Sequence, residues 1–122
     1  MIRASAVRPL RPALAILFAV MVAAACQPSA PAARVATSQV DLPRSYKFAP
    51  ADISVVVGTT VTWTNNDNFT HSVRLVDSGD TQLMKPGEHV TYTFAASGLY
   101  QYDCSLHPKD MRGSVLVGTE EE

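Results

Sequence analysis

Short β-type runs separated by turn residues fill the chain between Asp41 and Gly118, and this pattern constrains the fold more than any other feature. In residues 60–65, Val61 and Trp63 alternate with threonines, as expected of a strand with one buried face. No stretch after residue 40 keeps an apolar repeat near 3.6 residues over three turns, so a helical domain is not expected. Further strands are expected at residues 44–48, 53–57, 72–76, 90–94, 99–104 and 113–117.

About seven short strands, each with one apolar face, favour a β-sandwich of two sheets. The core of such a domain is small, so a bound metal ion would add useful stability. Composition excludes one class of partner. The formal net charge of the 122 residues is −1 and no long basic run occurs, so nucleic acid is not an expected partner.

The first 25 residues have the pattern of an export signal. Arg3, Arg8 and Arg11 precede an uncharged apolar stretch over residues 13–25. That stretch is shorter than the roughly 20 residues that span a membrane but fits the apolar region of a signal peptide. The folded part is therefore expected outside the cytoplasm, in the periplasm or on the extracellular face.

Cys26 follows three alanines, and small residues before a cysteine resemble the lipidation site of bacterial lipoproteins. We therefore predict lipidation of Cys26 and a membrane anchor, with ordinary signal cleavage as the alternative. A Pro/Ala-rich linker is expected over residues 26–40, the folded domain over residues 41–118 and an acidic tail over residues 119–122. A disulfide between Cys26 and Cys104 would join the domain to a flexible segment, so separate roles are expected.

Residues 104–111 bring together a thiol, an imidazole and a thioether: Cys104, His107 and Met111. A thiolate with two imidazoles and a weak axial thioether is the ligand set of a one-electron copper site. His71, after the Asn-rich turn, is the candidate for the second imidazole. Zinc is the alternative metal, but structural zinc sites use four Cys or His ligands from paired motifs. His89 is expected to be a surface residue.

The span from about Tyr46 to Val117 resembles the small blue copper proteins, or cupredoxins, of the plastocyanin and amicyanin type. This resemblance implies a Greek-key β-sandwich of about seven to eight strands with one copper ion at one end. It also implies that His71, Cys104 and His107 are strong ligands and Met111 is the axial ligand. The motifs that carry the resemblance are Phe48-x-Pro50-x-x-Ile53-x-Val55, Gly58-x-x-Val61-x-Trp63-x-Asn65, His71-x-Val73, Pro86-Gly87-Glu88, Thr93-Phe94, Gly98-x-Tyr100-x-Tyr102-x-Cys104 and Met111-x-Gly113.

The sequence departs from that family at three positions. The interval from Cys104 to Met111 is one residue longer than in amicyanin-like loops and one shorter than in plastocyanin-like loops. Thr70 stands where the family often has proline. Ser72 stands where the family often has an asparagine that bonds to the cysteine-bearing loop, and its hydroxyl could make a similar bond.

The resemblance implies a protein that shuttles single electrons between redox partners, such as a cytochrome or a copper reductase or oxidase. Transient docking is expected around His107, which Leu106 and Pro108 flank. Lys109, Asp110 and Arg112 lie nearby, so docking by one sign of charge is not predicted.

Two other classes of function remain. A copper carrier is the alternative function, although the Met-rich or His-rich tracts that would favour it do not occur. An enzyme is not expected, because three histidines are too few for the additional copper sites of the oxidases and reductases that share this fold. A monomer is expected.

Overall fold

The computed structural model describes Pro9 and residues 33–119. In this part of the chain nine strands form and no helix is present. No helix of the described residues could therefore cross a membrane. The strands are β1 (Val35–Ala36), β2 (Gln39–Leu42), β3 (Asp52–Val56), β4 (Thr60–Asn65), β5 (His71–Leu75), β6 (Thr81–Met84), β7 (His89–Thr93), β8 (Gly98–Asp103) and β9 (Arg112–Gly118).

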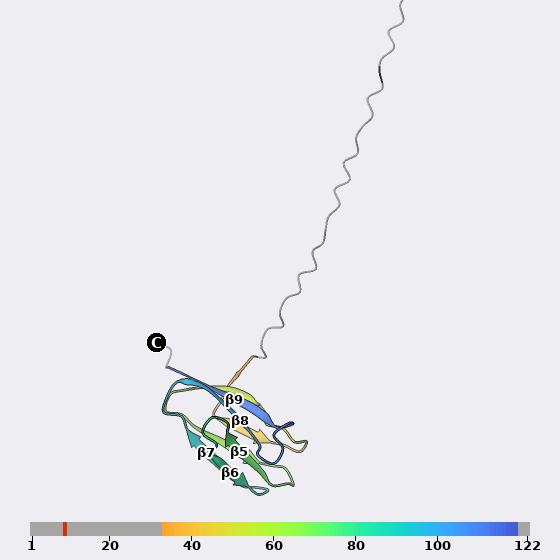
Figure 1. Ribbon diagram of the computed structural model, residues 1–122, viewed down its shortest axis with the longest axis vertical. Coiled ribbons are helices and arrows are strands. Elements are labelled where there is room, and N and C mark those ends of the chain that lie inside the picture. The colour runs from red at the N-terminus through yellow and green to blue at the C-terminus, as the bar shows by residue number, and fades with distance from the viewer. Residues whose placement is uncertain (1–8, 10–32, 120–122) are drawn as a thin grey trace, which may run out of the picture.

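The strands form two sheets, which confirms the predicted all-β sandwich. One sheet has the order β1-β3-β9-β8-β5-β6 and the other has the order β2-β4-β7. Strands β1, β3 and β9 are parallel neighbours, and β2 is parallel to β4. The remaining pairs are antiparallel, and Figure 1 shows β8 and β9 side by side.

Aromatic packing fills the core between the two sheets. The Trp63 and Tyr102 rings are fully buried and meet edge to face, with centroids 5.2 Å apart. The Tyr102 hydroxyl donates to the carbonyl of Ala51 at 2.6 Å, and burial of the phenol raises the pKa of Tyr102. A side chain at Gly113 would collide with the Ala51 carbonyl and the Tyr102 ring, so the start of β9 requires glycine there.

The strand register brings four loops to one end of the sandwich. Leu42 pairs with Asn65, His71 with Met84, and Asp103 with Arg112. Loops 43–51, 66–70, 85–88 and 104–111 therefore share this end, which we call the Cys104 end. Loops 57–59, 76–80 and 94–97 lie at the opposite end, which we call the Gly58 end.

Two sequence-based expectations about elements are wrong. Residues 44–46 form a turn and residues 47–48 belong to no strand, and Ser45 and Tyr46 have positive φ angles of 113° and 52°. The expected linker over residues 26–40 ends earlier, because β1 and the start of β2 lie within it and Val40 is buried. β1 and β2 form because they pair with strands that are distant in the sequence, which the local composition does not indicate. Strand β6 was also not predicted, because its residues do not alternate clearly.

Candidate metal centre

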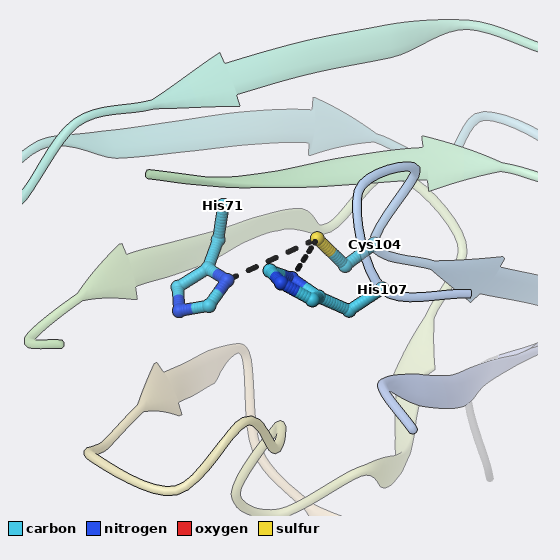
Figure 2. A group of neighbouring side chains, drawn as sticks. All are labelled: His71, Cys104 and His107. Atoms are coloured by element: carbon cyan, nitrogen blue, oxygen red, sulfur yellow. Dashed lines mark hydrogen bonds between the residues drawn. The ribbon is translucent and has the colours of Figure 1, made fainter. Parts of the chain in front are cut away.

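Three side chains that sequence analysis selected as metal ligands converge at the Cys104 end. One donor atom from each of His71, Cys104 and His107 lies within 4.8 Å of the others. The Cys104 Sγ atom is 3.9 Å from Nδ1 of His71 and 3.8 Å from Nδ1 of His107. Figure 2 shows both imidazoles directed at the sulfur. The three residues come from two separate segments of the chain, which only the fold brings together.

His71 is oriented by a buried carboxylate four residues earlier. Its Nε2 atom lies 2.8 Å from Oδ2 of Asp67. A carboxylate accepts here, so Nε2–H donates and Nδ1 keeps its lone pair for a metal ion. The hydrogen bond from His71 is the main cause that lowers the pKa of Asp67. The Asp67 side chain is only 5% exposed.

The loop that carries Asp67 is fixed by the fully buried side chain of Asn65. The Asn65 amide donates to the carbonyls of Phe69 at 2.8 Å and Met84 at 3.0 Å. Its Oδ1 atom accepts from the backbone N–H of Asp67 at 3.0 Å. One side chain at the end of β4 thus ties loop 66–70 to the end of β6, and with it the position of His71.

The Cys104 thiol meets the backbone and hydroxyl of Ser72 on the neighbouring strand. The Ser72 N–H donates to Sγ at 3.4 Å, and the Ser72 hydroxyl lies 3.8 Å from Sγ. The same hydroxyl accepts from the Ser105 N–H at 2.7 Å and pairs with the Ser105 hydroxyl at 2.7 Å. The bond across to the cysteine-bearing loop that the sequence suggested for Ser72 is therefore present.

Backbone hydrogen bonds close the loop from Cys104 to Met111. The His107 N–H donates to the Cys104 carbonyl at 3.1 Å, and the Met111 N–H donates to the His107 carbonyl at 3.0 Å. The Cys104 N–H donates to the Met111 carbonyl at 3.1 Å. Met111 is fully buried in the same core cluster as Cys104. Its role as a sulfur ligand stays a prediction.

Tyr46 covers the His107 ring. The two ring centroids are 4.8 Å apart with planes at 66°, and Tyr46 also stacks on Phe69 at 5.6 Å. The left-handed backbone conformation of Tyr46 turns this ring toward the site from a loop that sequence analysis expected to be a strand. Tyr46 and Asp67 are thus the site residues that sequence reasoning missed.

The donor set fits one metal ion. A metal–nitrogen bond of about 2.0 Å and a metal–sulfur bond of about 2.3 Å together reach about 4.3 Å, so one ion can bridge both sulfur–nitrogen separations. His71 and Cys104 are fully buried and His107 is partly buried. An ion at this position would therefore be shielded from water on most sides.

Two further residues were named in the sequence analysis. His89 is exposed at the start of β7, as expected. Cys26 lies outside the described residues, so its lipidation stays a prediction. Within the described residues Cys104 is a free, buried cysteine.

Comparison with known proteins gives a consistent match. The Cupredoxin-like domain family matches residues 14–117. Amicyanin of Paracoccus denitrificans is 38% identical over 77 residues, which cover 58% of each chain. Chloroplastic plastocyanin of Tetradesmus obliquus is 35% identical over 83 residues, which cover 57% of each chain. The match thus spans less than three fifths of these two relatives.

Solved structures resemble the fold as well. A purple cupredoxin from Nitrosopumilus maritimus superposes with a TM-score of 0.58 at 30% identity, covering 66% of this chain and 98% of that protein. An oxidised amicyanin variant superposes with a TM-score of 0.59 at 33% identity, covering 65% of this chain and 79% of that protein.

Proposed function

The chain belongs to the cupredoxin-like domain family, and from this membership we propose that it binds one copper ion and passes single electrons between redox proteins. The observation that carries the proposal is the convergence of one thiol and two imidazole nitrogens within 4.8 Å. Copper bound by such a set supplies a one-electron couple. The relatives named amicyanin and plastocyanin support this function.

The protein holds the donors of this set through its own contacts. His71 is held by Asp67, Cys104 by Ser72, and His107 by Tyr46 and the turn that begins at Cys104. Met111 is proposed as the weak axial ligand. Because the donors are fixed, they move little when the charge on the site changes by one, and a small rearrangement favours rapid electron exchange.

His107 is proposed as the point where electrons enter and leave. It is the partly exposed member of the three donors, whereas His71 and Cys104 have no exposed surface. Leu106 and Phe69, which lie beside the site, are about half exposed at 51% and 54%. A redox partner can therefore approach the exposed edge of His107 across an apolar surface.

The export pattern of residues 1–25 supports a location outside the cytoplasm, and Cys26 is the proposed site of a lipid anchor. Mass spectrometry of the mature protein tests this part alone. An acylated Cys26 at the new N-terminus is expected, whereas an unmodified N-terminal residue would refute the anchor.

Absorption spectroscopy tests the copper site. Copper-loaded protein should show a strong band near roughly 600 nm from charge transfer between thiolate and copper. Cys104→Ser should abolish the band, while His89→Gln, which changes an exposed histidine of β7, should leave it unchanged. A band that persists in Cys104→Ser would overturn the assignment.

Electrochemistry separates an electron shuttle from a copper carrier. A shuttle should give a reversible couple and fast self-exchange of electrons between oxidised and reduced copies. A slow, irreversible couple together with transfer of the metal to an apo-protein would favour the carrier instead.

A further inference from the structure

Exposed cations surround the proposed copper site. The fold brings five of them to the Cys104 end, from three loops and the first residue of β9. The exposed acids of this end are Glu88 and Asp110. Asp41 and Asp52 are partly buried and accept from Asn66 and Ser114, and Asp67 is buried against His71. The five cations are Arg44, Lys47, Lys85, Lys109 and Arg112. We call them the cationic ring.

Contacts place members of the ring close to the three donors. Arg44 donates to the Asn68 side chain at 3.4 Å, in the loop that carries Asp67. Arg112 donates to the carbonyl of Pro108 at 2.6 Å, one residue from His107. Lys47 follows Tyr46, which packs on the His107 ring.

The other two members are placed by their neighbours in the chain. Lys85 follows Met84, which pairs with His71 across β5 and β6. Lys109 lies two residues after His107. Along the sequence the charges near His107 are mixed. Only the fold adds the cations of loops 43–51 and 85–88 to the same end.

The opposite end has the opposite sign. In the described loops of the Gly58 end, Asp77 and Asp80 are the charged residues. Arg74 and Asp103, which pair across β5 and β8, neutralise each other through two hydrogen bonds of 2.8 Å. The segment 33–122 has seven basic and eleven acidic residues, so its net charge is 7 − 11 = −4. The exposed charge around the site is therefore opposite in sign to the net charge.

We propose that the Cys104 end is a docking surface for a redox partner whose own centre lies beneath an apolar patch bordered by carboxylates. This inference rests on the proposed function, because it names the partner of the same site. Tyr46, Phe69 and Leu106 form the apolar centre, and the cationic ring forms the rim. Screening limits electrostatic attraction to about 8 Å at physiological ionic strength. A partner that approaches the Cys104 end therefore responds to the charges of that end more than to the net charge of the protein.

A paramagnetic anion maps this surface without copper. Hexacyanochromate(III) is titrated into the isotope-labelled, metal-free full chain in a neutral detergent, and the broadening of amide signals is followed by NMR. Broadening should concentrate at loops 43–51, 85–88 and 104–111, whereas the cation tris(ethylenediamine)chromium(III) should broaden loop 76–80. Uniform broadening by the anion, or broadening centred on the Gly58 end, would overturn the proposal.

Electron-transfer rates supply a second test, because local and net charge predict opposite signs. Oxidation of the cuprous protein by hexacyanoferrate(III) should slow about threefold to tenfold as salt rises from low to physiological concentration. A negative net charge acting alone would make the same reaction faster. If the absorption band of the copper site near roughly 600 nm is missing, the proposed function fails. The NMR map does not need copper, so it still tests whether anions gather at the Cys104 end.

Charge-reversal variants localise the effect. The triple variant Lys47→Glu, Lys85→Glu and Lys109→Glu should reverse the salt dependence. The matched control, Asp77→Lys with Asp80→Lys, adds positive charge at the Gly58 end and should leave the rate within about twofold of the original. If the two variants change the rate of electron transfer by equal factors in opposite directions, the net charge governs the rate, and the proposal is contradicted.

Discussion

Replacement of Ser72 by alanine should destabilise the metal-free protein through the loop that carries Cys104. Ser72 is fully buried, and its hydroxyl accepts from the Ser105 N–H and pairs with the Ser105 hydroxyl, both at 2.7 Å. Alanine removes two hydrogen bonds worth about 1 kcal/mol each and leaves the Ser105 N–H without its acceptor. The expected loss is about 2–4 kcal/mol, or roughly 8–30 °C in Tm for a domain of this size.

Thermal unfolding followed by circular dichroism measures this loss, and two alanine variants serve as controls. Ser105→Ala keeps Ser72 as the acceptor for the Ser105 N–H, so it should lose about 1 kcal/mol or less. Thr60→Ala breaks an exposed hydroxyl pair with Thr93 at 2.8 Å, where water replaces the lost partner, and should change little. If Ser72→Ala is no less stable than Thr60→Ala, the Ser72 hydroxyl does not fasten the loop.

The same variant should lower the reduction potential of the copper-loaded protein. A hydrogen bond to the thiolate favours the reduced state, in which the sulfur is more negative. The Ser72 hydroxyl lies 3.8 Å from Sγ, a long contact worth about 0.5 kcal/mol, which corresponds to roughly 20 mV for one electron. Voltammetry that shows an unchanged or raised potential would mean that the hydroxyl bonds to Ser105 alone.

Two further predictions concern the carboxylate behind His71 and the buried phenol of the core. Asp67→Ala should weaken copper binding by about 10- to 100-fold, because His71 loses the partner that orients it. Competition with a copper chelator measures the affinity, and Asp77→Ala is the control. Equal copper affinities of the two variants would contradict the role of Asp67. The folded-state pKa of Tyr102 is raised by burial, so its contribution to stability is complete below the ordinary value of 10.0 and is lost as pH rises through the folded-state pKa. Denaturant unfolding between about pH 8 and 11 should therefore show a steeper alkaline loss in the original protein than in Tyr102→Phe, and parallel curves would refute this assignment.

The site was only partly predictable from the sequence. Cys104 and His107 are three residues apart in one loop, so their spacing indicated a shared ligand set. His71 could be chosen because it follows a strand and a turn. Asp67 was not selected, since an Asn-Asp-Asn turn is normally solvent-exposed and nothing local shows that one carboxylate turns inward toward a histidine.

The fold was predictable where periodicity was strong and not where pairing was long-range. Strand β4 matches the expected residues 60–65 because its alternation is strict. Strands β1 and β2 form within a Pro/Ala-rich segment because they pair with β3 and β4. Tyr46 was misassigned because positive φ angles at a serine and a tyrosine are set by the surrounding loops and leave no sequence pattern.

Each of the three donors has a main partner of its own, but some contacts are shared, because Tyr46 touches the rings of both His71 and His107. The partner of His71 is a carboxylate of loop 66–70, that of Cys104 is a hydroxyl of β5, and that of His107 is an aromatic ring of loop 43–51. A change at Asp67 therefore acts mainly on His71, whereas a change at Ser72 acts on the loop that carries both Cys104 and His107. Since the cationic ring contains none of these partners, substitutions there should change the choice of redox partner while the donors keep their positions, and each positive charge removed should also lower the copper potential through its Coulomb interaction with the site.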